Sequence, residues 1–304
     1  MGFLTDISHI WVGHYTDKKA MTGCTAIIFP QGAVAGVDVR GSAPGTRETD
    51  LLRGYNVVDR INAVMLSGGS AYGLDTASGA MKYLEDHGLG LHAGPGVVHI
   101  VPAAVIFDMT SWRPDTRPGA SEGYAACMNA TDSPFACGNV GAGTGATIGK
   151  AYGMEHCMRG GLGTACISLE NGVKVGALVV VNALGDVYDP ADGHIVAGAR
   201  INGDFKPLMD AVVDPGISFS NTTIGVIATN AKLTREEANK MASMAHDGLA
   251  MTVRPVHTMM DGDTFFGAAT CEVEEYDFIS ILIAAVKVTS KAILNAVEQE
   301  GAKA

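Results

Sequence analysis

The sequence is poor in charged residues, and in positively charged ones above all. Only 17% of the 304 residues are charged, and 21 lysines and arginines stand against 32 aspartates and glutamates, for a formal net charge of −11. A surplus of negative charge repels phosphate backbones and anionic lipids. We therefore expect neither nucleic acid nor a membrane among the partners of this protein.

Long apolar runs and export signals are also lacking. The longest apolar stretch near the C-terminus, 279–286, is bounded by Asp277 and Lys287 and is shorter than the roughly 20 residues that cross a bilayer. Asp6 and two histidines interrupt the N-terminal segment, so we expect no signal peptide. These observations favour a cytoplasmic protein.

The six cysteines include no C-x-x-C pair. A chain of this length that is 47% hydrophobic can fold around a large core without disulfides, so we expect reduced thiols. The nine histidines are dispersed, and His87 and His92 merely flank a glycine-rich turn. Because no ligand cluster is apparent, we expect no metal and no cofactor.

Glycine is abundant, with 39 residues, which indicates many tight turns and close backbone approaches. Apolar runs separated by glycine predict strands paired in hairpins, with helices grouped between them. The predicted hairpins pair 24–29 with 33–39 and 164–169 with 173–181. The other predicted strands are 63–66, 97–106, 222–229 and 264–270. The predicted helices are 70–86, 277–299 and one that begins with a capping box formed by Thr234 and Glu237. This order favours a layered α+β sandwich over a doubly wound parallel sheet.

Three glycine-rich motifs are weak signals. Residues 141–146 fit the G-x-G-x-x-A dinucleotide fingerprint, but an extended segment follows them in place of a helix. Residues 145–150 resemble the end of a P-loop, yet Ala151 stands where a magnesium-binding hydroxyl belongs. Residues 68–72 miss the nucleophile elbow, because Tyr72 occupies the fifth position. A dinucleotide-binding protein is nevertheless one alternative function.

Thr222 stands where a polar loop meets a buried strand. Threonine is common in strands, which is the ordinary explanation. The chemical explanation is an N-terminal nucleophile. In that chemistry the Thr222 hydroxyl attacks the carbonyl carbon of Asn221, and water then cleaves the resulting ester. The freed α-amino group, with a reference pKa of about 7.7–8.0, serves as the base for its own hydroxyl.

Seven sequence blocks extend this pattern over nearly the whole chain. They are I-W-V-G-H (10–14), R-G-S-A-P-G-T-R-E-T-D (40–50), S-G-G-S-A-Y-G-L-D (67–75), G-N-V-G-A-G-T-G-A (138–146), G-G-L-G-T (160–164), V-V-V-N-A-L-G-D-V (179–187) and N-T-T-I-G-V-I-A-T-N-A (221–231). In these blocks the chain resembles the β-peptidyl aminopeptidases, the related L-aminopeptidase/D-Ala-esterases and the 6-aminohexanoate-oligomer (nylon oligomer) hydrolases.

The resemblance implies a fold and a processing event. The fold is a four-layer αββα sandwich of the N-terminal-nucleophile-hydrolase type, formed by residues 1–304 as a single domain and usually assembled as a homotetramer. The precursor cuts itself between Asn221 and Thr222, leaving 1–221 as the α part and 222–304 as the β part.

The resemblance also assigns partners to Thr222. Asp261 and Asp263 look like the acidic pair of the nylon-oligomer branch, which would orient the amine and stabilise its ammonium form. Without the family, D-G-D would be a solvated turn. Asn182 resembles the amide that stabilises the oxyanion, a contribution of about 2.7–4 kcal/mol, although a strand-end asparagine can equally cap a turn.

Two positions leave questions open. Lys150 looks like the lysine near the pocket, but Arg159 is a competing match. Phe107 stands where relatives have a tyrosine, which removes one possible oxyanion donor.

The sequence thus predicts a self-processing amidohydrolase, with Thr222 forming an acyl-enzyme. Its substrates would be small peptides, β-peptides or ω-amino-acid oligomers. An acyltransferase of the ornithine acetyltransferase type, which shares the fold, is a second alternative, although the versions we know have alanine before the threonine.

Overall fold

The computed structural model describes residues 2–58, 60–109, 115–210 and 221–301. Its main sheet has nine strands in the order β10-β11-β16-β18-β2-β4-β7-β3, with β1 paired to β2. These strands are β1 (Trp11–Asp17), β2 (Thr22–Val39), β3 (Thr46–Arg47), β4 (Arg60–Ser67), β7 (Ala103–Val105), β10 (Gly161–Ser168), β11 (Lys174–Asn182), β16 (Thr222–Ala231) and β18 (Thr264–Val273). Four α-helices in the described residues flank them: α1 (Thr76–Asp86), α2 (Ala120–Met128), α3 (Arg235–Thr252) and α4 (Phe278–Gly301).

Short strands form small peripheral sheets. These pair β5 (Leu91–Ala93) with β6 (Gly96–Val98), β8 (Thr147–Ile148) with β9 (Met158–Arg159), β14 (Arg200–Ile201) with β15 (Asp204–Phe205), and β12 (Asp186–Tyr188) with both β13 (Ile195–Ala197) and β17 (Val253–Arg254).

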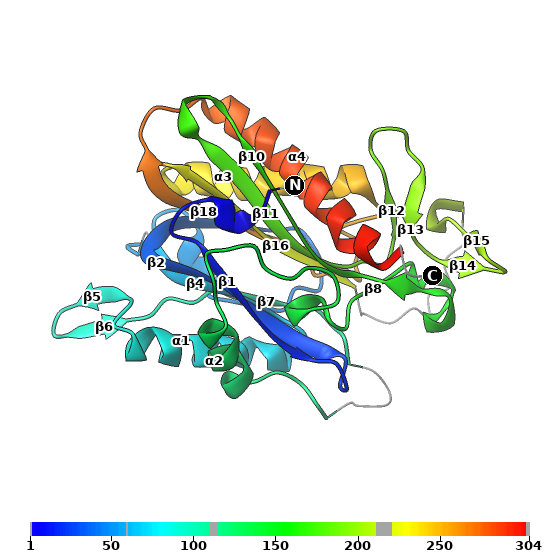
Figure 1. The fold of residues 1–304 in the computed structure, drawn as a ribbon, viewed down its shortest axis with the longest axis horizontal. Coiled ribbons are helices and arrows are strands. Elements are labelled where there is room, and N and C mark those ends of the chain that lie inside the picture. The colour runs from blue at the N-terminus through cyan, green and yellow to red at the C-terminus, as the bar shows by residue number, and fades with distance from the viewer. Residues whose placement is uncertain (1, 59, 110–114, 211–220, 302–304) are drawn as a thin grey trace.

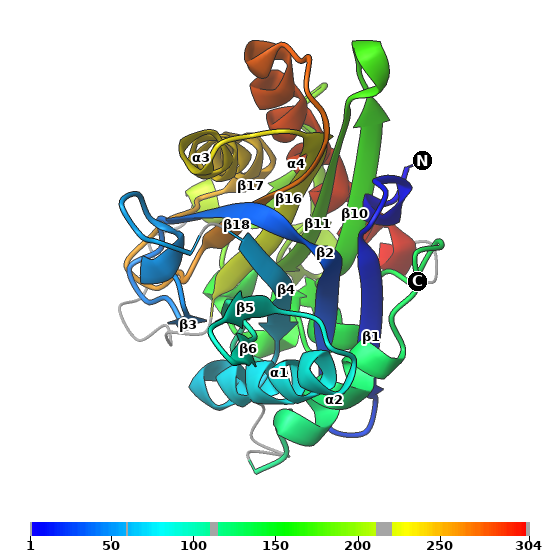
Figure 2. The same cartoon turned by 90° about the vertical axis from the view of Figure 1, so that its left-hand side faces the viewer.

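Three hydrophobic cores separate four layers of secondary structure. Helices α3 and α4 cover one face of the main sheet, and α1 and α2 lie at the opposite side of the molecule (Figures 1 and 2). Alternate residues of one strand serve different cores, because successive side chains of a strand point to opposite faces. On β11, Val179 packs toward α3 and α4, whereas Val180 joins the core between the two β layers. The predicted αββα sandwich is confirmed.

The long strand β2 joins the two β layers. We predicted a hairpin that turns at residues 30–32, and this prediction is wrong, since β2 runs unbroken over 18 residues. Instead of reversing the chain, this segment shifts the register against β4 between Ile28 and Ala33, with Gly32 at φ +72°. A bulge of this kind bends a strand without ending it. The first part of β2 therefore pairs with β1 and the second with β18.

Other expected elements are present. β10 and β11 form the predicted hairpin, which turns through Asn171 and Gly172 with positive φ. Thr234 Oγ1 accepts from the Glu237 main-chain N–H at 3.2 Å, and the Glu237 carboxylate accepts from the Thr234 N–H at 2.8 Å, so the predicted capping box begins α3. The predicted 97–106 strand is divided into β6 and β7, because Pro102 lacks an N–H for a sheet.

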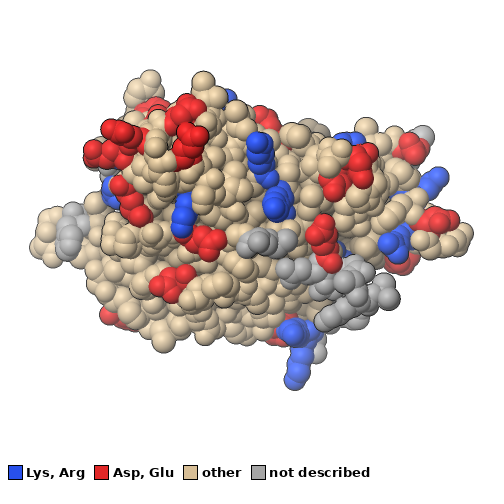
Figure 3. All heavy atoms as spheres, turned by 45° about the horizontal axis from the view of Figure 1, so that its top comes forward, with Lys and Arg blue, Asp and Glu red and all other residues tan. Residues whose placement is uncertain are grey.

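Helix α4 is apolar over a longer segment than the stretch 279–286 that the sequence analysis considered. The segment Phe278–Glu298 has a mean hydropathy of 1.6 and is long enough to cross a membrane, but half of it is buried inside the protein. It packs against α3, β10 and β11, and its buried side chains belong to the core on that side of the sheet. Packing within the protein thus accounts for the apolar side chains of the buried half. Acidic and basic side chains are interspersed on the face drawn in Figure 3.

The approach of α3 to β2 depends on a glycine. A Cβ added at Gly36 would lie 2.3 Å from the Asn239 main-chain nitrogen and 2.6 Å from the Ala238 carbonyl carbon. We expect Gly36→Ala to destabilise the protein by about 1–3 kcal/mol, because neither backbone can move without disturbing a packed layer. Urea unfolding measures this. The matched control is Gly54→Ala, whose added Cβ meets nothing within 4 Å. Equal losses in the two variants would contradict this packing.

Candidate active site

Thr222 lies at the meeting point of two strands. It is the first residue of β16 and, in the antiparallel register, the cross-strand partner of Asn182, the last residue of β11. Asn221, just before it, forms a bridge with Asp261, and the Asn221 carbonyl oxygen accepts from the Gly262 N–H at 3.0 Å. The fold therefore brings together the threonine, the asparagine and the acidic segment that the sequence singled out. Thr222 itself is 6% exposed.

The peptide bond between Asn221 and Thr222 lies in contact with the threonine hydroxyl. In the continuous chain Thr222 Oγ1 donates to the Asn221 carbonyl oxygen. Gly262 makes this crowding possible, since a Cβ there would lie 2.9 Å from Thr222 Oγ1 and 2.8 Å from the Ala43 carbonyl oxygen. The glycine of D-G-D is thus required by close approach, a role that the sequence analysis missed.

The two aspartates are buried and fully oriented, at 3% exposed for Asp261 and 2% for Asp263. Asp263 Oδ1 accepts from the Thr223 N–H at 2.7 Å, and its Oδ2 accepts from the His257 N–H at 3.0 Å. Asp261 Oδ2 accepts from the N–H and the hydroxyl of Thr258 at 2.7 and 2.5 Å. A solvated turn, the alternative from the sequence, is therefore excluded. Sequence reasoning missed His257 and Thr258, which precede the motif in a segment without periodicity.

Burial shifts the ionisation of two site residues in opposite senses. It raises the pKa of Asp261 to about 6, and repulsion from the Asp263 carboxylate acts in the same direction. It lowers the pKa of the Lys150 ammonium to about 7, against the opposing attraction of Cys157, Asp261 and Asp108. A low-dielectric site disfavours the charged form of either group. Asp261 forms a bridge with Asn221, and Lys150 bonds to Asn182, the cross-strand partner of Thr222. Perturbed groups gathered in one buried region are typical of an active site.

Lys150 forms hydrogen bonds to Asn182. Its Nζ donates to Asn182 Oδ1 at 2.8 Å and to the Asn182 carbonyl oxygen at 3.0 Å. The Thr147 N–H also donates to Oδ1, at 3.0 Å, and Asn182 Nδ2 donates to the Phe107 carbonyl oxygen at 3.2 Å. The orientation of the Asn182 amide is therefore fixed, with its oxygen toward Lys150 and its nitrogen toward Phe107.

Arg159, the competing cation, contacts other residues. Its Nε donates to Asn139 Oδ1 at 3.0 Å, and its guanidinium also donates to the Thr144 carbonyl oxygen. Of the two candidates, Lys150 is the one that the structure places on Asn182.

A small cavity of about 140 Å³ opens beside Thr222. The described residues that line it are uncharged: Ala43, Pro44, Gly45, Ser70, Ala71, Val105, Ile106, Phe107, Asn221, Thr222 and Met260. Phe107 thus faces the cavity, and its ring brings no hydroxyl to it. Apolar walls with a few polar groups are typical of sites for small molecules.

The glycines of 141–146 do not form a dinucleotide site. They begin with a 3-10 turn, Gly141–Gly143, and the short strand Thr147–Ile148 follows. A dinucleotide fingerprint needs a helix whose N-terminus faces the pyrophosphate, and these residues provide none.

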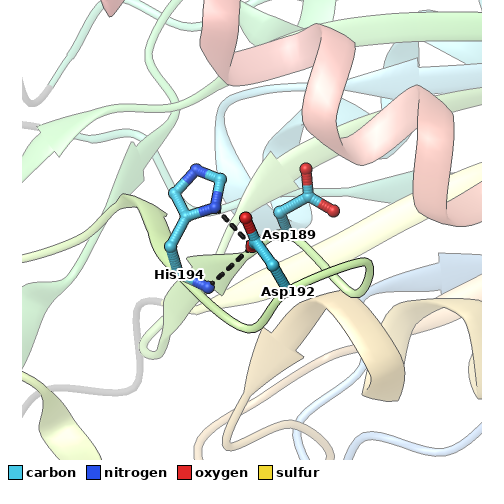
Figure 4. A group of neighbouring side chains, drawn as sticks. All are labelled: Asp189, Asp192 and His194. Carbon is cyan, nitrogen blue, oxygen red and sulfur yellow. Dashed lines mark hydrogen bonds and ion pairs between the residues drawn. The ribbon is translucent and has the colours of Figure 1, made fainter.

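One group of side chains has the spacing of metal ligands. Asp189, Asp192 and His194 lie together in the loop between β12 and β13 (Figure 4), and one ligand atom of each lies within 4.8 Å of the others. Asp192 and His194 are exposed, and His194 Nδ1 pairs with Asp192 Oδ1 at 2.5 Å. Exposed acidic groups of this kind are common without an ion, so the arrangement does not indicate a metal centre.

Comparison with known proteins places this geometry in a family. Residues 3–301 match the model of peptidase family S58. An uncharacterized aminopeptidase of Mycobacterium leprae is 45% identical over 296 residues, which cover 90% of this chain and 80% of the relative. A 6-aminohexanoate-oligomer endohydrolase of Kocuria is 32% identical over 277 residues, covering 88% of this chain and 75% of the relative.

A solved structure supports the fold. The L-aminopeptidase D-Ala-esterase/amidase of Ochrobactrum anthropi, described as a variant of the Ntn hydrolase fold, superposes with a TM-score of 0.71 at 18% identity, covering 97% of this chain and 85% of that one. These matches favour neither the acyltransferase nor the dinucleotide-binding alternative. With its N-terminal-nucleophile fold and its peptidase and hydrolase relatives, the chain belongs to peptidase family S58 and is an amide-bond hydrolase.

Proposed function

We propose that this hydrolase cuts its own chain between Asn221 and Thr222 and then uses Thr222 as an N-terminal nucleophile. The observation that carries the proposal is the contact between the Thr222 hydroxyl and the carbonyl group of the preceding residue, in a buried site. In the first step Oγ1 bonds to the Asn221 carbonyl carbon, the peptide C–N bond breaks, and the nitrogen of Thr222 takes the proton that the hydroxyl loses. Water then hydrolyses the ester, leaving a carboxylate on Asn221 and a free amine on Thr222.

The same groups then act on a substrate. The Thr222 amine accepts the hydroxyl proton, and Oγ1 attacks the carbonyl carbon of the substrate amide. The C–N bond then breaks as the leaving amine takes that proton from the Thr222 ammonium, and water hydrolyses the acyl-enzyme. The acid pair orients the amine and stabilises it as an ammonium once it holds the proton. Asn182, whose amide is oriented by Lys150, supplies the oxyanion donor beside the threonine. Preorganised donors of this kind lower a barrier by about 2.7–4 kcal/mol.

The cavity supports small acyl groups as substrates, because it measures about 140 Å³. Its described lining carries no charged side chain, so those residues select an acyl group by its size and shape. The names of the two relatives, an aminopeptidase and an oligomer endohydrolase, indicate amides of amino acids and of ω-amino acids as the class to test. Both parts would stay in one domain, and we further propose a cytoplasmic homotetramer.

Processing is tested by intact-mass spectrometry. We expect the wild type to show two masses that sum to the precursor plus one water, Thr222→Ala to show one mass, and Thr222→Ser to be processed. Amidase activity on an amino-acid p-nitroanilide should follow processing and fall by at least a thousandfold in Thr222→Ala, since the nucleophile is lost. A Thr222→Ala chain that is cut or active would contradict the proposal.

The low pKa of Lys150 predicts a pH dependence of stability. The folded state releases this proton near pH 7, whereas the unfolded state keeps it to about pH 10.4. Between these values the unfolded state binds more protons, so the free energy of unfolding gains up to about 1.4 kcal/mol per pH unit from this group. In a Thr222→Ala chain, urea unfolding between about pH 7 and 8 should show this gain, and Lys150→Met should remove it. Above this range, cysteines whose pKa values are raised by burial in the folded state act in the opposite sense.

The matched control is Lys82→Met. Lys82 is exposed and pairs with Glu85 and Asp86 on α1, so its charge persists in both states over this window. A loss of pH dependence in both variants, or in neither, would show that Lys150 is not the titrating group.

A further inference from the structure

His257 and Asp263 are joined by two hydrogen bonds close to Thr222. Asp263 Oδ2 lies 3.0 Å from the His257 main-chain nitrogen and 2.8 Å from His257 Nδ1. Asp263 is 2% exposed. The His257 side chain is largely buried too, with 20% of it exposed. A carboxylate accepts from both donors, so the ring carries its proton on Nδ1.

The other ring nitrogen meets no hydrogen-bonding group of the described residues. His257 Nε2 is buried and makes no hydrogen bond to them, and the ring meets the His246 ring edge-on, with centroids 4.8 Å apart. His246 is engaged elsewhere, through Nε2 and the Asp38 carbonyl oxygen at 3.0 Å. Burying a polar nitrogen without a partner is unfavourable. The bond on Nδ1 is therefore what holds this ring in place.

The backbone of His257 is held in an unfavourable conformation. Its φ is +58°, in the left-handed region that residues other than glycine seldom adopt, with asparagine, aspartate and histidine found there more often than the rest. This conformation lets the main-chain N–H and the ring nitrogen of one residue reach the same carboxylate oxygen. A strained backbone that is kept by specific contacts often lies at a functional site.

The Asp263 carboxylate also binds the start of β16. While Oδ2 of Asp263 is occupied by His257, Oδ1 accepts from the Thr223 N–H at 2.7 Å. The carboxylate thus links His257 to the residue that follows Thr222. Rotation of the Asp263 side chain would release the Thr223 N–H and alter the position of the nucleophile.

We propose that His257 is a positioning residue of this active site, whose side-chain N–H holds Asp263 in the rotamer that anchors Thr223 and so aligns Thr222. The role rests on the proposed function of Thr222. His257 does not touch the reacting atoms. Its effect passes through the carboxylate.

Two substitutions isolate the side-chain donor. Glycine and asparagine both accept the positive φ of residue 257, and both lose the packing of the ring on His246. Only asparagine has an N–H near the position of Nδ1. We expect His257→Gly to slow conversion of newly translated precursor, followed by intact mass, by 10- to 100-fold, and His257→Asn to stay within about 5-fold of the wild type. Equal rates in the two variants would overturn the proposal.

A second measurement does not depend on catalysis. In Thr222→Ala chains, hydrogen exchange of the Thr223 amide should be at least tenfold faster with His257→Gly than with His257→Asn, which should match the parent. Unchanged exchange in the glycine variant would show that His257 does not hold Asp263. If the wild type is never processed while exchange behaves as expected, the function proposed for Thr222 fails and the positioning contact stands.

Discussion

The register between β11 and β16 is the constraint on which the site depends. It pairs Thr222 with Asn182, and a shift of one strand by one residue would place these two side chains on opposite faces of the sheet. The parallel pairing of β16 with β18 begins with Ile224 opposite Thr264, which places the acidic residues just before β18 beside the start of β16. Three segments that are distant in the sequence thus supply one site because three adjacent strands begin or end at the same edge.

Burial gives these residues their chemistry. A hydroxyl, two carboxylates and an amine in water would have ordinary ionisation, and the layers around them exclude most of that water. The pKa of Asp261 rises to about 6 and that of Lys150 falls to about 7, because a low-dielectric surrounding disfavours the charged form of each group. Each group is also held by main-chain donors or acceptors, so little reorganisation is needed when charge develops.

Much of this arrangement could be predicted from the sequence. The hairpin at Asn171, the capping box at Thr234 and the strand that starts at Thr222 have local signals, and local signals carry over when the fold agrees with them. The bulge in β2 could not be predicted, because the sequence Pro-Gln-Gly is compatible with both a turn and a bulge. Which of the two forms depends on the strands that pair with this segment in the folded protein. The assignment of Asp261 and Asp263 as partners of Thr222 came from the family resemblance and not from local chemistry, where D-G-D is typical of a turn. Gly262 and His257 were missed because their roles depend on contacts with Ala43 and Asp263 in the folded chain.

The central claim is that one threonine gains a free amine by losing the residue before it. N-terminal sequencing of a preparation with measured amidase activity tests this most directly. The account predicts a chain that begins Thr-Thr-Ile-Gly, in an amount that tracks the activity. An active preparation that consists of one uncut chain would contradict it.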